Sequence, residues 1–287
     1  MEAPATWFEA GARLAWLAGL FLGLSGTSGA ESGTQGLGLA CPLEPGRSTR
    51  EIKVDGRNRS VVVEVGALAG KSGPAPVVFF WHGWGGAAGA LLDGIGASRS
   101  WPEAVFIAPE GLRRRFPGLS SRSQPGWQVA PGEHSDRDMA FFDALVADLS
   151  RLPCLDTRRF LSTGFSNGGY FSNLLGCERA GVLAGIAPVG GGGPTEACET
   201  PVPVWIAHGR GDRVIPLREG RGSFSRWQET NGCKDIEVDR DGCQVARGCK
   251  RETVLCTFPG RHTWPMALTR RWQQFLAAQR RAAAPQP

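Results

Sequence analysis

The chain has 287 residues, of which 41% are hydrophobic, and its formal net charge is +5. After removal of a presequence, this length predicts one large domain with a sizeable core. The positive excess is mostly arginine dispersed along the chain, which is typical of a solvated surface and argues against a nucleic-acid partner. One dense arginine run, residues 113–115, is the candidate for contact with an anionic or polysaccharide ligand.

The N-terminal residues resemble an export signal. Residues 14–24 are uncharged and apolar, and small residues at 28–30 follow them. We therefore predict a signal peptide over residues 1–30, a secreted or periplasmic protein, and no stable membrane insertion after cleavage. A retained N-terminal anchor is the alternative, although the stretch is shorter than the roughly 20 residues of a membrane span. The remaining chain divides into an N-terminal extension (31–50), a catalytic domain (51–281) and a disordered tail (282–287).

Apolar runs with short loops between them predict a mostly parallel sheet flanked by helices. Ser135 is the expected cap of a helix whose apolar stripe runs from Met139 to Leu152, and Trp272, Phe275 and Leu276 indicate a closing helix. We see no internal repeat and no second globular domain. The expected strands are residues 61–65, 77–81, 104–108, 159–163, 185–189, 202–207 and 254–258.

A Gly-x-Ser-x-Gly sequence at residues 164–168 stands between a predicted strand and a predicted helix. This setting is typical of a nucleophile elbow, in which the turn is so tight that side chains at the flanking positions would collide. Ser166 is thus the candidate nucleophile. By itself, the pattern is a weak signal in a chain with 41 glycines.

The other members of a catalytic triad are sought in the order serine, acid, histidine, each in a loop after a later strand. Asp212 lies in the glycine-rich loop after strand 202–207, and His262 follows the last predicted strand. His262 would take the proton of the serine, and Asp212 would accept the other ring N–H. His208 is the rival base, but at the end of its strand it is better suited to bond the loop backbone.

Two backbone N–H groups are expected to stabilise the oxyanion of an acyl intermediate. One belongs to Asn167, the residue after the nucleophile. The other is assigned to Trp84, in the glycine-rich loop after strand 77–81, where the main chain can approach a substrate closely. A plain turn at the end of the strand is the alternative for this loop.

Eight cysteines all follow the predicted cleavage site. An even number in an exported protein predicts up to four disulfides, although 105 pairings are possible. Zinc is the rival interpretation of the cluster over residues 233–256, but its spacings lack a Cys-x2-Cys knuckle. We expect no metal and no cofactor.

These motifs together resemble one known group of enzymes. His82-Gly83-Trp84-Gly85-Gly86, the elbow, Ala187-Pro188-Val189, His208-Gly209-Arg210-Gly211-Asp212 and His262-Thr263-Trp264-Pro265 occur in the order seen in the secreted α/β-hydrolase esterases, a group of polyhydroxybutyrate depolymerases and feruloyl esterases. The similarity covers residues 41–278, and it implies the α/β-hydrolase fold with the same three catalytic residues. The group often has cysteine where Trp84 stands, which alters the pocket wall rather than the triad.

The sequence therefore predicts a monomeric, secreted serine carboxylesterase that acts through an acyl-enzyme. The expected substrates are polysaccharide-linked phenolic esters and hydroxyalkanoate polyesters. An aromatic rim is expected from Trp84, Trp127, Tyr170 and Trp264, of which Trp127, Tyr170 and Trp264 are the predicted substrate-binding residues. A serine peptidase with the same triad is one alternative, and a non-catalytic binding protein of the same fold is another.

Overall fold

The computed structural model describes residues 36–116 and 120–282. The predicted signal peptide lies outside the described residues, as does nearly all of the predicted tail. All described residues belong to one compact unit, Thr34–Pro287.

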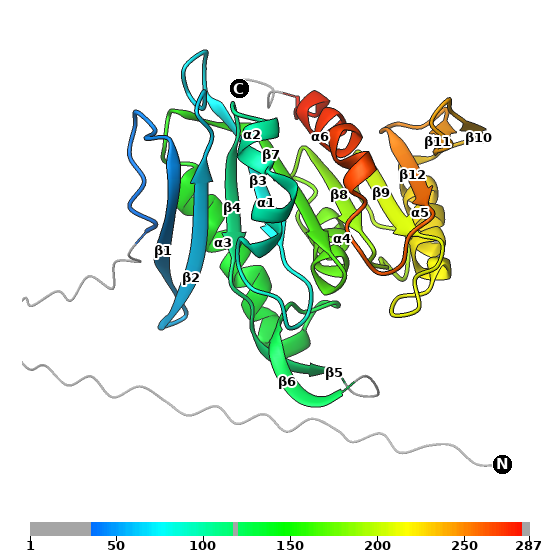
Figure 1. The fold of residues 1–287 in the computed structure, drawn as a ribbon, viewed down its shortest axis with the longest axis horizontal. Coiled ribbons are helices and arrows are strands. Elements are labelled where there is room, and N and C mark those ends of the chain that lie inside the picture. Colours follow the sequence, from blue (N-terminus) through cyan, green and yellow to red (C-terminus); the bar gives the residue numbers. More distant parts are fainter. Residues whose placement is uncertain (1–35, 117–119, 283–287) are drawn as a thin grey trace, which may run out of the picture. The chain divides into compact units, whose positions relative to one another are not determined.

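A ten-stranded sheet forms the centre of this part of the chain (Figure 1). The strand order is β1-β2-β4-β3-β7-β8-β9-β12-β11-β10. The strands from β4 to β12 in this order are parallel, and antiparallel strands flank them at both edges. The strands are β1 (Gly46–Val54), β2 (Arg57–Val65), β3 (Ala75–Trp81), β4 (Val105–Pro109), β7 (Leu155–Phe165), β8 (Gly185–Val189), β9 (Val204–Gly209), β10 (Asp235–Val238), β11 (Gln244–Arg247) and β12 (Thr253–Phe258). A separate hairpin pairs β5 (Leu112–Phe116) with β6 (Ser120–Gly126).

Helices cover both faces of the sheet, because successive side chains of a strand point to opposite sides. In β3, Phe79 and Trp81 join one core cluster with α3, α4 and α5, whereas Val78 and Phe80 join a second cluster with α1, α2 and α6. Figure 1 shows α1, α2 and α6 lying over one face. The helices are α1 (Ala90–Ile95), α2 (Ala97–Ser100), α3 (Arg137–Leu149), α4 (Asn167–Glu178), α5 (Leu217–Asn231) and α6 (Thr269–Ala278), with 3-10 turns η1 (Glu133–Asp136) and η2 (Met266–Leu268).

Every strand predicted from the sequence is present, and so is the closing helix, now α6. Two expectations need correction. Ser135 does not cap α3, because it lies inside η1 with a positive φ, and Asp136 precedes the helix without a capping side-chain bond. The predicted extension contributes to the fold, since β1 begins at Gly46, and Leu37 and Leu43 are buried in the core.

All eight cysteines form disulfides, which confirms the prediction of four disulfides over the zinc alternative. The pairs are Cys41–Cys154, Cys177–Cys198, Cys233–Cys249 and Cys243–Cys256. Across residues 36–116 and 120–282, the structure contains no helix that is both long and apolar enough to traverse a bilayer.

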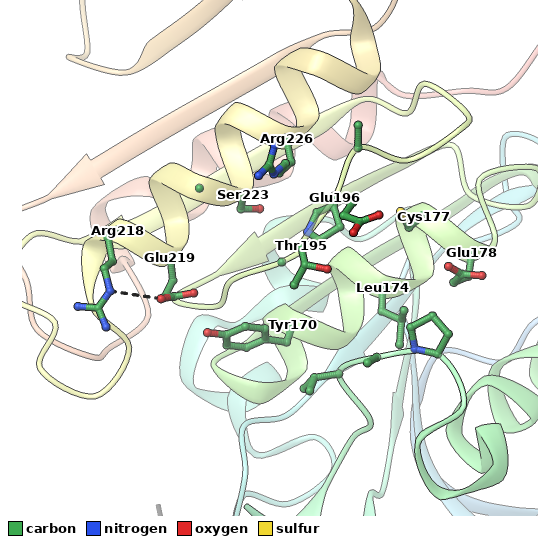
Figure 2. A pocket seen from close by; sticks show the side chains of 17 residues that line it. Tyr170, Leu174, Cys177, Glu178, Thr195, Glu196, Arg218, Glu219, Ser223 and Arg226 are labelled. Carbon is green, nitrogen blue, oxygen red and sulfur yellow. Dashed lines mark ion pairs between the residues drawn. The ribbon is translucent and has the colours of Figure 1, made fainter. Parts of the chain in front are cut away.

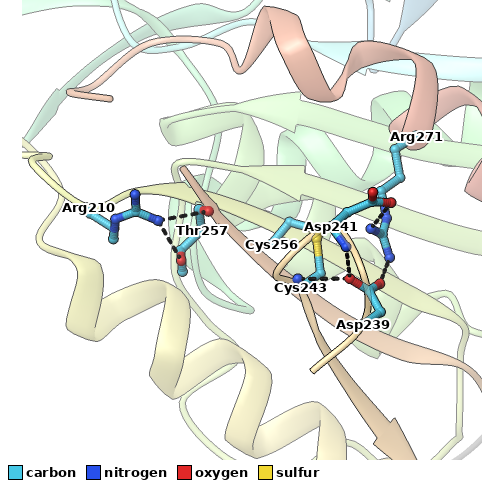
Figure 3. The surroundings of a disulfide bond; sticks show 7 residues. All are labelled: Arg210, Asp239, Asp241, Cys243, Cys256, Thr257 and Arg271. Carbon is cyan, nitrogen blue, oxygen red and sulfur yellow. Dashed lines mark hydrogen bonds and ion pairs between the residues drawn. A yellow bond between two sulfur atoms is a disulfide. The ribbon is translucent and has the colours of Figure 1, made fainter. Parts of the chain in front are cut away.

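The Cys243–Cys256 bond ties β12 to the turn that joins β10 and β11 (Figure 3). In this turn, the Asp239 carboxylate accepts hydrogen bonds from the backbone N–H groups of Asp241 and Cys243, each at 3.0 Å. Arg271 of α6 donates to the carboxylates of both Asp239 and Asp241. The polar turn is thus fastened to the strand that leads to His262 and to the helix that follows it.

Candidate active site

Ser166 stands at the junction of β7 and α4, and its backbone has the geometry of an elbow. Its φ is 57° and its ψ is −119°. A residue other than glycine adopts this backbone conformation only at a cost of about 1–3 kcal/mol. A Cβ at Gly164 would lie 2.3 Å from the Gly168 carbonyl oxygen, and one at Gly168 would lie 2.0 Å from that of Trp81. Both glycines are therefore sterically required, as the sequence predicted.

The structure brings Ser166, Asp212 and His262 together from three separate loops. The distance from Ser166 Oγ to His262 Nε2 is 2.8 Å, and that from His262 Nδ1 to Asp212 Oδ2 is 2.7 Å. The Asp212 side chain is 1% exposed and that of His262 17%. Asp212 Oδ1 also accepts the N–H groups of Val214 and Ile215, each at 2.9 Å, so both oxygens have fixed roles.

Main-chain hydrogen bonds hold the loop of Asp212 against the loop of His262. The N–H of Gly211 donates to the Gly260 carbonyl oxygen at 2.9 Å, and the N–H of Arg210 donates to that of Phe258 at the same distance. The Arg210 guanidinium reaches the backbone oxygen of Thr257 at 3.3 Å (Figure 3). These contacts explain how Asp212 and His262, which are 50 positions apart in the sequence, form a hydrogen bond with each other.

His208, the rival base, is fully buried and does not contact Ser166 in the structure. Its Nε2 lies 2.8 Å from the Ile215 carbonyl oxygen, which can only accept, so Nε2 carries the proton. This bond fixes the same loop that Asp212 holds. The expectation that His208 bonds the loop backbone is confirmed.

The loop after β3 passes very close to the serine. A Cβ on Gly83 would lie 3.2 Å from Ser166 Cβ. Within the described residues, neither the N–H of Trp84 nor that of Asn167 has a hydrogen-bond partner, so both are available to a substrate oxygen. The Asn167 side chain clamps Trp127, accepting its N–H at 2.7 Å and donating to its carbonyl oxygen at 2.9 Å.

His82 has a positioning role that the sequence did not suggest. Its Nε2 accepts the N–H of Gly111 at 3.0 Å, so Nδ1 carries the proton and donates to the Gly83 carbonyl oxygen at 2.7 Å. Burial lowers the pKa of this imidazole and favours the neutral ring that such a pair of bonds needs. The only feature of the sequence that could have indicated this role is a histidine at the end of a predicted strand, and a plain turn explains that feature equally well.

The expected aromatic rim is wrong for two of its four members, Trp127 and Trp264, whereas Trp84 and Tyr170 are half-buried. Trp127 is 0% exposed because its ring packs against both Trp81 and Phe171, which also contact each other. Trp264 is 8% exposed, and its indole N–H donates to Thr269 at 3.1 Å. Tyr170 borders an open cavity of about 750 Å³ between α4 and α5 (Figure 2).

The site offers hydroxyl, imidazole and carboxylate groups in line but no set of metal ligands. In the part of the chain that the structure describes, His, Cys, Asp and Glu side chains do not gather in a group of three able to hold a metal ion. The contacts of Ser166 with His262 and of His262 with Asp212 suit proton transfer and nucleophilic attack by these protein groups.

Comparison with known sequences identifies relatives of the whole domain. Feruloyl esterase D of Neurospora crassa is 26% identical over 243 residues, covering 75% of this chain and 78% of that protein. Probable feruloyl esterase C of Aspergillus terreus is 26% identical over 262 residues, covering 83% of this chain and 90% of that protein. This chain is similar to feruloyl esterases of fungi at 24–29% identity. No family model matches it.

Solved structures similar to this chain agree on the fold. An acetyl xylan esterase from Aspergillus awamori has a TM-score of 0.59 at 14% identity and covers 79% of this chain and 99% of its own. A ferulic acid esterase from Anaeromyces mucronatus, solved with ferulic acid, has a TM-score of 0.52 at 14% identity. The match covers 81% of this chain and 90% of that protein. The chain has the α/β-hydrolase fold, as predicted.

Proposed function

We propose that this protein is an exported serine carboxylic-ester hydrolase, with Ser166 as nucleophile, His262 as general base and Asp212 as the acid that orients it. The observation that carries the proposal is the continuous contact from Ser166 Oγ through His262 to Asp212, with bonds of 2.8 and 2.7 Å. A serine hydroxyl is not ionised at neutral pH, so it needs such a base in contact to become a nucleophile.

The reaction begins when Ser166 Oγ attacks the carbonyl carbon of the ester and its proton passes to His262 Nε2. The negative charge that develops on the carbonyl oxygen is stabilised by the N–H groups of Trp84 and Asn167. His262 then donates its proton to the leaving alcohol oxygen, which leaves the acyl group on Ser166.

Hydrolysis of this acyl-enzyme repeats the sequence with water as the nucleophile. His262 takes a proton from the water as its oxygen attacks the acyl carbon, and then returns a proton to Ser166 Oγ. Throughout both halves, Asp212 accepts a hydrogen bond from the Nδ1–H of His262 and stabilises the imidazolium. The products are a carboxylic acid and an alcohol, with no cofactor consumed.

Two observations support a narrower function. The names of the relatives favour aryl esters of the ferulate type over the other substrate predicted from the sequence, a hydroxyalkanoate polyester. The four disulfides favour export, because disulfides persist in oxidising compartments.

The test is a substrate panel of p-nitrophenyl acetate, the corresponding anilide, methyl ferulate, acetylated xylan and polyhydroxybutyrate. We expect hydrolysis of the esters, with methyl ferulate preferred, and loss of all turnover in Ser166→Ala. Ser225→Ala removes an exposed hydroxyl on α5 and serves as the matched control. A preference for the anilide would identify a peptidase instead, and turnover that survives Ser166→Ala would refute the mechanism.

A further inference from the structure

The turn between β1 and β2 meets the short helix η1 at a cavity that the proposed mechanism does not use. We call it the arginine cavity, because Arg57, Arg59 and Arg137 line it. Its volume is about 380 Å³, which is that of a small-molecule site. No residue of the candidate triad is among its lining residues.

The side chain of Arg59 is buried and keeps one N–H group without an acceptor. It is 3% exposed, and its guanidinium carbon lies 3.9 Å from the centre of the Phe141 ring. Its Nη atoms have partners, among them Asp138 Oδ1 at 3.2 Å, but within the described residues no atom accepts its Nε–H. A buried donor without a partner is unfavourable, so an acceptor atom on a ligand would complete the hydrogen bonds of this group.

Arg137 shares both this carboxylate and this shortage of acceptors. Its Nε lies 3.7 Å from Asp138 Oδ1, beyond hydrogen-bond distance, and is buried without another acceptor in the part of the chain that the structure describes. One carboxylate thus lies against two guanidinium groups. Burial lowers the pKa of Arg59 to about 10 despite Asp138, so this single carboxylate does not offset the desolvation of the charge.

The charges around the cavity leave one positive charge uncompensated. Arg57 is exposed, and its side chain forms no hydrogen bond or ion pair within residues 36–116 and 120–282. Asp55 contributes a carboxylate to the lining, and Asp138 pairs with Arg59. Three guanidinium groups therefore face two carboxylates, and a ligand with a single negative charge would balance them.

His134 and Ser135 add two neutral donors to the lining. Partial burial, followed by the positive charges of Arg137 and Arg114, lowers the pKa of His134, so the ring is neutral at neutral pH and carries one N–H. Within the described residues, neither the imidazole nor the Ser135 hydroxyl has a hydrogen-bond partner. Both can donate to an anion without adding charge to the cavity.

Charge balance and lining favour a carboxylate over other anions. A planar carboxylate accepts two parallel hydrogen bonds from one guanidinium fork. A phosphate group with nearly two charges would exceed the one charge that needs a partner. The cavity is also larger than a carboxylate group, and the apolar side chains of Val54 and Leu112 line it, so the rest of the ligand can be apolar.

We propose that the arginine cavity binds an organic monocarboxylate. The carboxylate pairs with Arg57 and compensates the charges of Arg59 and Arg137, while the apolar body contacts Val54 and Leu112. This site is independent of the proposed esterase function, because it shares no residue with the candidate triad.

The first experiment follows His134 by NMR in the untagged protein, with benzoate as the probe. The chain has four histidines, and the His134 resonance is identified by its absence from His134→Asn, because asparagine tolerates the positive φ of this position. We expect benzoate to raise the pKa of His134 in a saturable manner, since a nearby negative charge favours the imidazolium. Benzamide, which has the same ring without the charge, should leave this pKa unchanged.

The second experiment compares two variants of the β1–β2 turn that change its charge in opposite directions. Arg57→Gln should weaken benzoate binding roughly tenfold, as for one lost hydrogen bond to a charged group. Asp55→Asn should tighten it about 2- to 5-fold, because it removes a like charge, and asparagine suits the φ of 48° at this position. Arg221→Gln, exposed on α5, is the matched control and should leave the affinity unchanged. Circular dichroism and the Tm show that each variant is folded.

Each outcome decides the proposal. A pKa of His134 that does not respond to benzoate, or that responds equally to benzamide, overturns the site. Equal affinities in Arg57→Gln and Asp55→Asn overturn the assigned charges. Tighter binding of inorganic phosphate than of benzoate overturns the choice of a carboxylate, and acetate that binds as tightly as benzoate overturns the apolar contacts. No ester is used in these experiments, so their results stand whether or not the protein is an esterase.

Discussion

Replacement of Asp212 by asparagine is expected to reverse the proton pattern of the triad while leaving the fold intact. In the structure, Oδ1 of Asp212 accepts two backbone N–H groups, from Val214 and Ile215, so the amide oxygen of asparagine must occupy that side. The amide nitrogen then faces His262 Nδ1, where the carboxylate oxygen stood at 2.7 Å. Two donors cannot share this bond, so Nδ1 becomes an acceptor.

The consequence appears at the other ring nitrogen. With Nδ1 unprotonated, the neutral imidazole carries its proton on Nε2, which stands 2.8 Å from Ser166 Oγ and can no longer accept the serine proton. We expect kcat for p-nitrophenyl acetate to fall about 10³–10⁴-fold, as for a triad in the wrong tautomer. This loss corresponds to about 4–5.5 kcal/mol of transition-state stabilisation.

Thermal unfolding accompanies the assay, because the asparagine keeps both loop hydrogen bonds and should shift the Tm little. Asp239→Asn is the matched control, since it makes the same chemical change in the distant β10–β11 turn and should retain full kcat. If Asp212→Asn keeps kcat within about tenfold of the parent while folded, the assigned role of Asp212 is refuted.

Three further outcomes are expected elsewhere in the molecule. Replacing both Cys243 and Cys256 by serine removes a disulfide between residues 13 positions apart. The free energy of unfolding should fall by about 3 kcal/mol and the Tm by about 6–12 °C in a thermal melt, and an unchanged Tm would contradict this. The hydrogen bond from Arg271 lowers the pKa of Asp239, so its carboxylate stabilises the fold above the ordinary aspartate pKa, and that stability is lost as the pH falls through the lowered value. Urea unfolding should therefore find Asp239→Asn less stable than the parent by about 0.2–1 kcal/mol at neutral pH, with the difference vanishing once the pH falls below the lowered pKa, and a constant difference would count against the pair. Gly83→Ala would bring a methyl group within 3.2 Å of Ser166 Cβ and should lower kcat/KM roughly 10- to 100-fold at an unchanged Tm; unaltered kinetics would show that this approach is not needed.

The sequence predicted the arrangement of the candidate triad because the topology follows from simple rules. Ser166, Asp212 and His262 each come after a strand that reads as apolar, and the carboxyl ends of parallel strands share one edge of a sheet. What the sequence lacked was the register between the loops. The bond from Gly211 to Gly260 and the clamp of Asn167 on Trp127 are contacts between distant segments, and no local pattern encodes them.

The missed elements are those whose residues bury little apolar surface. In β1, only Ile52 and Val54 are buried, because the strand lies at the edge of the sheet, so its sequence reads as a polar extension. For Trp127 the error is the opposite: the sequence predicts an exposed side chain, and the structure buries it. This residue follows Pro125 and Gly126, which favours a surface loop, yet its ring packs against Trp81 and Phe171 in the core. Burial of a loop residue depends on which distant elements meet around it.

The most direct test of the central claim is to map the residue that reacts with a fluorophosphonate. This reagent phosphonylates a serine whose hydroxyl is activated by an adjacent base: the serine oxygen bonds to phosphorus and fluoride leaves. Mass spectrometry of the digested protein should find one adduct per chain, on Ser166, and His262→Ala should abolish it while Ser225→Ala does not. An adduct on another residue, or one on Ser166 that forms equally well without His262, would contradict the account.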